Sequence, residues 1–523
     1  MTIDVDPVSD RGGDATAGGT ARRGPGPRDR HHRVVVIGTG FAGIGAAIRL
    51  RQAGIHDVVV LERADDVGGT WRDNHYPGCQ CDVPSNLYSF SFAPNPAWSR
   101  TFAPQGEIWA YLQTVTRDFG VTPHIRFGHE VLEARWDDTA SVWRIRTNHG
   151  EISADVVISG HGGLSEPAYP ELPGLDTFAG AAFHSADWHH DHDLAGERVA
   201  VIGTGASAIQ FVPAIQPRVG HLDLYQRTPP WIVPRPDRPF TDREKRLYRS
   251  WPLAQKLNRL GVYLGRELLV PGLVNKPALM KLPERLAREH LRRQVADPEL
   301  RAKLTPHFQI GCKRILLSND YYPSLTQPNV DVLTDGVAEV RPHSIVGRDG
   351  VERPTDTIIY GTGFKVTDHP VMHRLIGRNG RSIAEHSADG SLRAYYGTTV
   401  PDFPNLFLMT GPNTGLGHNS IVFMIESQLN YVVDCLRTMD ERGLATVEVR
   451  TDAVATFDEE IQRRLQTSVW NTGGCASWYL DANGRNTTLW PGFTWEFRRR
   501  TRRFDPEAYT LTPARRAAVT TGA

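Results

Sequence analysis

Short runs of branched apolar residues, each followed by glycines and then by a helical pattern, occur twice along the chain. RVVVIGTGFAGIGAAIRL begins at Arg33, and RVAVIGTGASAIQFVPAI begins at Arg198. Each run predicts a buried parallel strand, and the apolar positions after the glycines repeat at helical spacing. The pattern therefore predicts two strand–turn–helix units of the kind that binds a dinucleotide.

The glycines of both units stand where such a turn needs them. They are Gly38, Gly40 and Gly43 in the first unit, with Gly203, Gly205 and Ala208 at the matching positions of the second. The turn lets the backbone approach a pyrophosphate, which lies on the positive N-terminus of the following helix. One such motif is weak evidence, but two in the same strand–helix context are strong evidence.

The two units differ at the end of their second strand. DVVVLE ends at Glu62, where a carboxylate accepts hydrogen bonds from ribose hydroxyls. In the second unit LDLY is followed by Gln226, Arg227 and Thr228, a guanidinium and a hydroxyl that suit a 2′-phosphate. The first unit therefore suits FAD, and the second suits NADPH rather than NADH.

Two further apolar strands indicate that the domains are interleaved. DVVISG (155–160) and DTIIYG (356–361) both begin with Asp and end at Gly. We expect each to close a nucleotide-binding sheet where the chain crosses to the other domain. The predicted fold class is α/β with two interleaved Rossmann-like domains, an FAD-binding domain of residues 33–160 and 365–523 and an NADP-binding domain of residues 161–234 and 313–364.

Between these parts, residues 235–312 have a different pattern. Segments rich in Leu and Arg, such as LPERLAREHLRRQV, predict amphipathic helices without a nucleotide signature. We expect a helical insertion in the NADP domain, with its charges on a solvated face.

Composition excludes several classes of function. Lys+Arg and Asp+Glu both number 59 among the 523 residues, so a nucleic-acid-binding surface is not expected. The apolar segment 260–274 is interrupted by Arg266, Glu267 and Pro271 and cannot form a transmembrane segment. We expect a monomer or weak homo-oligomer.

The N-terminus and the cysteines indicate a cytoplasmic location. Residues 1–32 lack an apolar signal-peptide core and predict a disordered tail. Five cysteines do not form the pattern of a disulfide framework, and the missing signal indicates a reducing compartment. Cys79 and Cys81 form a CxC, which leaves a redox-active dithiol improbable but open.

The segment between the two units, FAGAAFHSADWHHD (178–191), carries chemistry-bearing residues at fixed spacing. Phe178, Gly180, His184 and Trp188 resemble the FxGxxxHxxxW fingerprint of Baeyer–Villiger monooxygenases, class B flavoprotein monooxygenases. The fingerprint continues with Pro or Asp, and this chain departs from it with His189.

Other motifs extend the resemblance over about residues 33–505. GGTWRDNHYPGCQCD (68–82) resembles the family's second motif, and Lys313 and Arg314 stand where the family carries its catalytic arginine. GTGF (361–364) resembles the family's return segment, and Trp478 stands where the family uses a tryptophan to contact NADP.

The resemblance implies a reaction and roles for individual residues. Hydride from NADPH reduces FAD, and O2 gives a C4a-peroxyflavin that inserts oxygen beside a ketone carbonyl or oxidises an aldehyde or sulfide. Arg314 would hold the peroxide anion, Asp82 would orient that guanidinium, and His184 would couple movement of the linker to catalysis. Lys313, with Arg227 and Thr228, would contact the NADP phosphate.

The residues expected to bind the two cofactors lie in the glycine turns, the second motif, the phosphate-recognition segment and the C-terminal loop. They are Gly38, Gly40, Phe41, Gly43, Glu62, Gly69, Thr70, Trp71, Tyr76, Asp82, Tyr88, Gly203, Thr204, Gly205, Ser207, Ala208, Arg227, Thr228, Lys313, Gly363 and Trp478.

No metal site is expected at His189, His190, Asp191 and His192, because they lack the spacing of ligands on one helix face. Three other functions remain open: an N- or S-oxidising flavin monooxygenase, an NADPH-dependent flavin disulfide reductase, and a non-catalytic NADPH sensor. Trp188 and the Asp82/Arg314 pair argue against the first of these functions, and the absence of a CxxC pair argues against the second.

Overall fold

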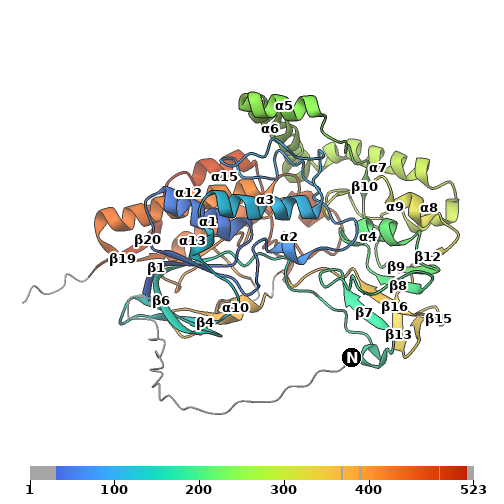
Figure 1. Ribbon diagram of the computed structural model, residues 1–523, viewed down its shortest axis with the longest axis horizontal. Helices are drawn as coiled ribbons and strands as arrows, with labels where there is room; N and C mark the ends of the chain where they lie inside the picture. The colour runs from blue at the N-terminus through green and yellow to red at the C-terminus, as the bar shows by residue number, and fades with distance from the viewer. Residues whose placement is uncertain (1–30, 367–368, 388–390, 482, 515–523) are drawn as a thin grey trace, which may run out of the picture.

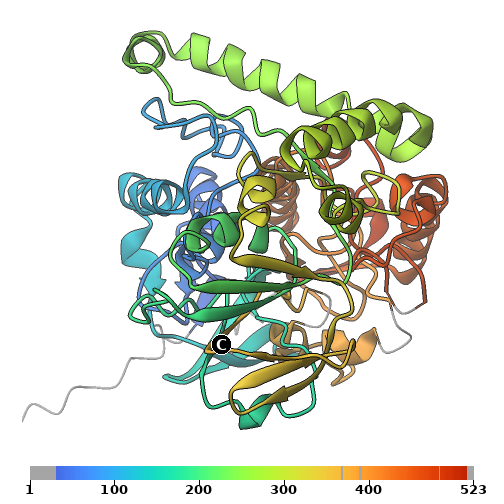
Figure 2. The ribbon, with the colours of Figure 1, turned by 90° about the vertical axis from the view of Figure 1, so that its right-hand side faces the viewer.

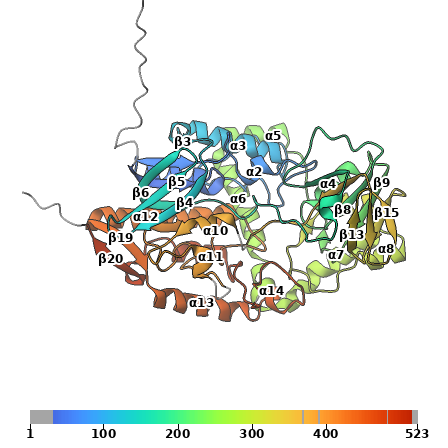
Figure 3. The ribbon, with the colours of Figure 1, turned by 90° about the horizontal axis from the view of Figure 1, so that it is seen from below.

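The computed structural model describes residues 31–366, 369–387, 391–481 and 483–514. A mixed sheet and an all-parallel sheet lie at opposite ends of the molecule, with helices over and between them (Figures 1 and 3). This arrangement confirms the predicted α/β fold class.

The first sheet is built around the strand before the first glycine turn. β1 (His31–Ile37) pairs in parallel with β2 (Val58–Leu61) on one side and with β6 (Gly150–Ser159) on the other. The sheet is completed by β3 (Ile125–Arg126), β4 (Val131–Asp137), β5 (Val142–Thr147), β17 (Leu375–Ile376) and β18 (Leu406–Leu408). β1 begins two residues earlier than expected, so His31 and His32 belong to the sheet and not to the tail; the rest of the predicted tail lies outside the described residues.

The helices of this half cover the sheet and reach the C-terminal part of the chain. α1 (Phe41–Gln52) packs against α12 (Ile421–Arg442) at Gly45, where an added Cβ would lie 3.0 Å from Leu429. The other elements are α2 (Thr70–Asp73), α3 (Gln105–Asp118), α10 (Pro370–Arg374), α11 (Ile383–His386), α13 (Thr451–Leu465), α14 (Val469–Thr472), α15 (Thr494–Arg500) and the antiparallel pair β19 (Leu444–Val449) and β20 (Tyr509–Pro513).

The second sheet repeats the same plan with five parallel strands. Their order is β12 (Val330–Leu333), β9 (His221–Tyr225), β8 (Arg198–Ile202), β16 (Thr357–Tyr360) and β7 (Ala181–His184). β16 lies beside β8 as β6 lies beside β1, so each Asp-to-Gly strand joins the sheet of its glycine unit. The expectation that these strands close their sheets is wrong, because β18 pairs with β6 and β7 pairs with β16 on the far side. The remaining elements are α4 (Ala208–Ile215), α9 (Tyr321–Leu325) and the meander β13 (Val337–Arg341), β14 (Ser344–Gly347) and β15 (Glu352–Pro354).

The segment expected to be a helical insertion is helical and leaves and returns through one small ladder. β10 (Ile232–Val233) pairs in parallel with β11 (Leu316–Leu317). Between them lie α5 (Asp242–Ser250), α6 (Pro252–Glu267), two short turns (271–275 and 277–280), α7 (Lys281–Gln294) and α8 (Pro298–Lys303). α5 and α6 lie at the top of the molecule, and α7 and α8 lie toward the second sheet (Figures 1 and 2).

The expectation that the insertion turns its charges to solvent is wrong for α6. Arg259 and Arg266 donate hydrogen bonds inward to backbone carbonyls of the first half of the chain, and Glu267 is buried. The reason is that those carbonyls lie in loops, whose unpaired backbone groups need donors. Periodicity alone cannot locate such donors in three dimensions.

The two chain crossings between the halves lie against each other. Ala168 donates a backbone hydrogen bond to the carbonyl of Gly363 (2.9 Å), and Lys365 donates one to the carbonyl of Glu166 (2.9 Å). The outgoing and returning segments therefore form one double connection between the sheets.

Candidate active site

The first glycine turn has the shape that a bound pyrophosphate needs. Gly38 has φ +92°, and a Cβ on Gly43 would lie 1.9 Å from the carbonyl oxygen of Gly38. A Cβ on Gly69 would lie 3.1 Å from the Cα of Gly40, so two backbones approach closely at the start of α1. The turn at Gly38 and Gly43 and the close approach of Gly69 to Gly40 both require glycine. The first N–H groups of α1 have no partner within the helix and are available to an anion.

Glu62 lies beside this turn at the end of β2. Its carboxylate accepts hydrogen bonds from Thr39 N (3.0 Å) and Thr39 Oγ1 (2.6 Å), and it pairs with Arg72 of α2 at 3.1 Å. The carboxylate is thus held next to the glycine backbone, in the place where a ribose would be recognised.

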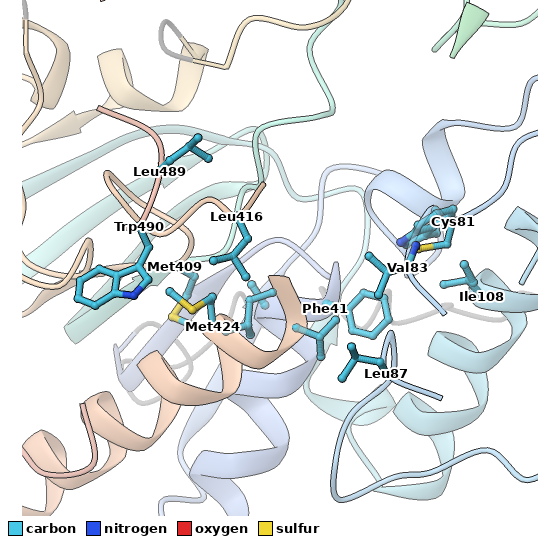
Figure 4. Close-up of a cluster of buried hydrophobic side chains, with 14 of the residues drawn as sticks. Phe41, Cys81, Val83, Leu87, Ile108, Met409, Leu416, Met424, Leu489 and Trp490 are labelled. Carbon is cyan, nitrogen blue, oxygen red and sulfur yellow. The ribbon is translucent and has the colours of Figure 1, made fainter. Parts of the chain in front are cut away.

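The aromatic candidates of the first half lie around the same region. Gly69 (φ +50°) is the N-cap of α2, and Thr70 is its first residue. Trp71, the next residue of α2, donates a hydrogen bond from Nε1 to Tyr88 Oη at 3.0 Å. Phe41 is buried in the cluster of Figure 4, together with Val83. The ring of Phe41 packs edge-on against Tyr88, with ring centroids 5.2 Å apart.

Tyr76 and the CxC segment meet the second half of the chain at α4. Tyr76 Oη donates to Gln210 Oε1 (3.1 Å), and Gln210 Nε2 donates to the carbonyl of Gln80 (3.0 Å). Gly78 has φ +78°, and its Cβ would lie 2.6 Å from the carbonyl oxygen of Gln210. Gln210, which sequence reasoning missed, thus joins the two halves next to Asp82.

The second glycine turn has the same build as the first. Gly203 has φ +110°, and a Cβ there would lie 2.4 Å from the carbonyl oxygen of Gly361. Gly205 follows, Ser207 is the N-cap of α4, and Ala208 is its first residue. Thr204 Oγ1 donates to the carbonyl of Thr228 at 3.1 Å, which ties the turn to the segment after β9.

Two cations that are far apart in sequence come together beside this turn. Arg227 follows β9, and Lys313 follows the insertion. Burial and the positive charge of Arg227 both lower the pKa of Lys313. Like charges repel, so a place that holds two of them is suited to an anion such as a phosphate.

Asp82 and Arg314 form a bidentate ion pair. Arg314 Nε donates to Asp82 Oδ2 at 2.5 Å, and the second guanidinium nitrogen donates to Asp82 Oδ1 at 2.7 Å. About a third of the Arg314 side chain and a quarter of the Asp82 side chain are exposed. Burial lowers the pKa of Arg314, but the charge of Asp82 outweighs it and raises that pKa above its usual value.

Two further arginines lie near Asp82 and were not predicted as site residues. Arg266 donates to the carbonyl oxygen of Asp82 (3.1 Å), and Arg235 donates to that of Cys81 (2.5 Å). Burial raises the pKa of Asp82, but the charges of Arg314, Arg266 and Arg235 outweigh it and lower that pKa. Asp82 is therefore ionised at neutral pH.

The remaining contacts of Arg314 come from the C-terminal half of the chain. Its third nitrogen donates to the carbonyl of Leu416 at 3.1 Å, just before α12. Tyr479 is buried, which raises the pKa of its hydroxyl group. The positive charge of Arg314 partly offsets that rise. No sequence pattern distinguishes Tyr479 from other buried tyrosines. The family resemblance pointed to its neighbour Trp478 instead.

Trp478 lies on the surface of its loop. It is 52 % exposed and packs edge-on against Tyr479, with ring centroids 4.7 Å apart. In this loop Tyr479 is the residue that lies near Arg314, and the ring of Trp478 is turned to solvent.

A disulfide joins this loop to the segment before Arg314. Cys312 and Cys475 are bonded, although 163 residues separate them, and their Cα atoms lie 6.1 Å apart. This finding differs from the expectation of reduced cysteines, because only the tertiary fold brings the two thiols together. Cys79 and Cys81 are free and buried, and burial raises the pKa of Cys79 to about 12.

The fingerprint residues hold the linker against the second sheet. A Cβ on Gly180 would lie 2.2 Å from the carbonyl oxygen of Asp356, so the linker passes too close for any side chain. Trp188 is buried against Phe211 of α4, and Phe178 is partly buried.

His184 ends β7 and lies away from solvent beside the return segment. Its Nδ1 accepts a hydrogen bond from Ala186 N at 3.0 Å, and its ring packs edge-on against Phe364. Burial lowers the pKa of His184 to about 4, while the backbone of Gly363 opposes that shift. The imidazole is therefore neutral and packed at the double connection.

The histidines after the fingerprint point to different partners. His190 Nε2 lies 2.8 Å from His75 Nδ1, and His189 stacks on Phe183. His192 lies 3.1 Å from a carboxylate oxygen of Glu197.

Comparisons with known proteins find a family model that matches part of the chain and relatives that match most of it. Residues 35–235 match the family model described as pyridine nucleotide-disulphide oxidoreductase. Over 486 residues the chain is 54 % identical to a Baeyer–Villiger monooxygenase of Streptomyces coelicolor, covering 92 % of this chain and 93 % of that one.

Solved structures agree over almost the full length. A cyclohexanone monooxygenase from Rhodococcus sp. Phi1 bound to NADP+ is 29 % identical with a TM-score of 0.82, covering 93 % of this chain and 100 % of that one. OTEMO in complex with FAD and NADP is 26 % identical with a TM-score of 0.82, covering 92 % and 99 %. Within the described residues, every helix is too short or too polar to cross a membrane.

Proposed function

The chain belongs to the Baeyer–Villiger monooxygenases, and from that premise we propose that it uses FAD, NADPH and O2 to insert one oxygen atom beside a carbonyl. The product of a ketone is an ester or a lactone. An aldehyde or a sulfide would be oxidised at the same site. The observation that carries this proposal is the bidentate Arg314–Asp82 pair, which joins the loop after the CxC segment to the segment after the helical insertion.

FAD fits the first turn. The close backbone approach of Gly40 and Gly69 leaves room for a pyrophosphate at the start of α1, and Glu62 lies where ribose hydroxyls would donate. When bound, the flavin accepts hydride from NADPH and activates O2. The protein has to position it and exclude water.

NADPH fits the second turn. The N-terminus of α4 would face the pyrophosphate, and Arg227 and Lys313 would hold the 2′-phosphate, with the Thr228 hydroxyl beside them. A single phosphate between the two cations would attract both and offset the burial and the repulsion that together lower the pKa of Lys313.

Arg314 would supply a fixed positive charge to the negative charge that develops during oxygenation. A guanidinium suits this role because it stays charged in a dry site and does not release a competing proton. Its two nitrogens on Asp82 and one on Leu416 O fix its plane before substrate arrives. The Arg314 guanidinium then does not have to reorient when the negative charge develops.

Asp82 would act as the residue that orients Arg314. The positive charges of Arg266 and Arg235 further favour its ionised form, and both side chains hold the loop that carries it. The carboxylate therefore stays ionised, and about a third of the Arg314 side chain stays exposed.

The linker would connect hydride transfer with oxygenation. His184 packs where the outgoing and returning crossings meet. A rotation of the NADP half relative to the FAD half would therefore change the packing of its ring. We assign residues 33–160 and 365–523 to the FAD half and 161–234 and 313–364 to the NADP half, with 235–312 inserted.

A substrate panel tests the proposal. Purified holoenzyme is given cyclic, aromatic and linear ketones, aldehydes and sulfides, and NADPH consumption is followed separately from oxygenated product by gas chromatography. The proposal expects an ester or lactone from at least one ketone in proportion to NADPH consumed. NADPH oxidation that yields only hydrogen peroxide with every substrate, or N-oxides but no esters, would refute it.

A further inference from the structure

The outward face of α6 carries a continuous stripe of leucines. Leu253, Leu257, Leu260, Leu264 and Leu268 are between 49 % and 80 % exposed. Their spacing of three and four residues places them on one side of the helix. The stripe runs for about 22 Å at 1.5 Å per residue.

Neighbouring residues extend this apolar face. Trp251, just before α6, is 52 % exposed, and Leu247 of α5 is 43 % exposed. At the start of α7, Leu279, Leu282 and Leu286 are 52 % to 73 % exposed. Exposed apolar residues on this scale mark an interaction surface.

The fully buried positions of α6 are polar, and beside them Ala254, Val262 and Tyr263 pack against the core. Gln255 Nε2 donates to Asn86 Oδ1 (2.9 Å) and to the carbonyl of Asn95 (2.7 Å). Arg259 donates to the carbonyl of Asn86 (2.7 Å). An ordinary surface helix has the opposite arrangement, with its apolar stripe toward the core.

The C-terminal end of α6 is held in the same way. Arg266 donates to the carbonyl of Asp82, and the carboxylate of Glu267 accepts from Thr494 N (3.0 Å) and Thr494 Oγ1 (2.7 Å). Turning the helix to bury its leucines would break these bonds and leave buried polar groups unpaired. The leucines are therefore fixed outward.

Charge indicates what covers this face. Residues 242–293 hold 13 Lys and Arg and 5 Asp and Glu, a net formal charge of +8 in a chain whose net charge is zero. The exposed bases include Arg243, Arg246, Arg249, Lys256, Lys276, Lys281 and Arg285. A second copy of the chain would bring an equal positive charge against this face, which repels it.

We propose that the apolar face formed by α5, α6 and the start of α7 docks on an anionic phospholipid surface. The leucines and Trp251 would enter the interfacial region, and the bases would contact the lipid phosphates. α6 is 16 residues long and would lie in the plane of the surface without crossing it. Its polar inner face keeps it attached to the enzyme.

Vesicle sedimentation tests this proposal with the full-length holoenzyme. Vesicles of phosphatidylcholine and phosphatidylglycerol in equal parts should carry the enzyme down, vesicles of phosphatidylcholine alone should carry much less, and high salt should weaken the binding. Leu257→Glu/Leu264→Glu should lower the bound fraction at least about tenfold. Val351→Glu, which changes an apolar residue 49 % exposed on the β14–β15 turn, is the matched control and should bind as the wild type does.

A second variant separates docking from folding. Lys256→Glu/Lys281→Glu leaves every leucine in place and should also reduce binding to the anionic vesicles, with FAD content unchanged. Absence of wild-type binding to anionic vesicles, or full binding by the leucine variant, would overturn the proposal. So would light scattering that shows a wild-type dimer and a monomeric leucine variant, because a second copy would then cover the face.

Discussion

Arg314 and Asp82, 232 residues apart in the sequence, are joined by two nearly parallel hydrogen bonds of 2.5 and 2.7 Å. The pair lies between loops from both halves of the chain, and Leu416 O takes a further guanidinium hydrogen. A charge held in this way is placed before the reaction begins, which is the condition under which one ion stabilises a transition state strongly.

Replacing Asp82 by Asn should reveal the ion pair in the pH dependence of stability. The pKa of Asp82 is lowered in the folded protein, so its charge stabilises the fold above its unfolded pKa of about 3.9, and that contribution is lost as pH falls through the lower folded value. Wild type should melt at a higher temperature than Asp82→Asn between pH 5 and pH 8, and the difference should shrink below about pH 4. A difference that stays constant into acid would mean that the charge contributes nothing.

Coenzyme choice should depend on Arg227 and Lys313. Losing a charge-assisted contact to the 2′-phosphate costs ~1.5–3 kcal/mol, so Arg227→Ala should lower kcat/KM for NADPH by roughly 10- to 150-fold and leave NADH almost unaffected. Arg218→Ala is the control, because Arg218 is exposed and pairs with Asp193 on the same half. Equal kcat/KM for NADPH and NADH in the wild type would contradict this assignment.

His184 should act by packing and not by proton transfer. Its pKa of about 4 leaves the imidazole neutral through the working range, so His184→Gln should keep the shape of the pH–rate profile between pH 5.5 and pH 8. His184→Ala should retain FAD and change the KM for NADPH or the yield of product per NADPH. If His184→Gln removed an inflection near pH 6.5, the residue would be titrating during turnover.

The Cys312–Cys475 bond should hold the Tyr479 loop beside Arg314. Thiol titration of the denatured protein should find three thiols without reductant and five after reduction, since Cys79, Cys81 and Cys435 are free. Cys312→Ser/Cys475→Ser should raise the KM for NADPH with FAD content unchanged, and Cys435→Ser should behave as the wild type. Five thiols before reduction would show that the bond does not form.

Local chemistry explains which parts of this account were predictable from sequence. Gly38, Gly43 and Gly203 could be identified because positive φ and close backbone approach leave a glycine signature within a few residues. Glu62 and Arg227 could be predicted as cofactor-binding residues because they stand at the end of the second strand of their glycine units. The pairing of Asp82 with Arg314 came only with the family resemblance, because no periodicity links residues so far apart.

The parts that sequence missed all depend on tertiary contacts. Arg266 looks like a solvated charge in an amphipathic helix, but its partner is a loop carbonyl of Asp82. Gln210 reads as an ordinary residue of α4, and only the approach of Gly78 gives it a role. The Cys312–Cys475 bond likewise requires the folded C-terminal loop.

Product formation by Arg314→Ala tests whether Arg314 supplies the charge for oxygenation. FAD should remain bound and the flavin should still be reduced by NADPH, while ester or lactone measured by gas chromatography falls by ~100-fold or more. Arg314→Lys should recover little, because an ammonium cannot reproduce the fork that meets Asp82. Near wild-type conversion of a ketone by Arg314→Ala would place the oxygenation centre elsewhere in the molecule.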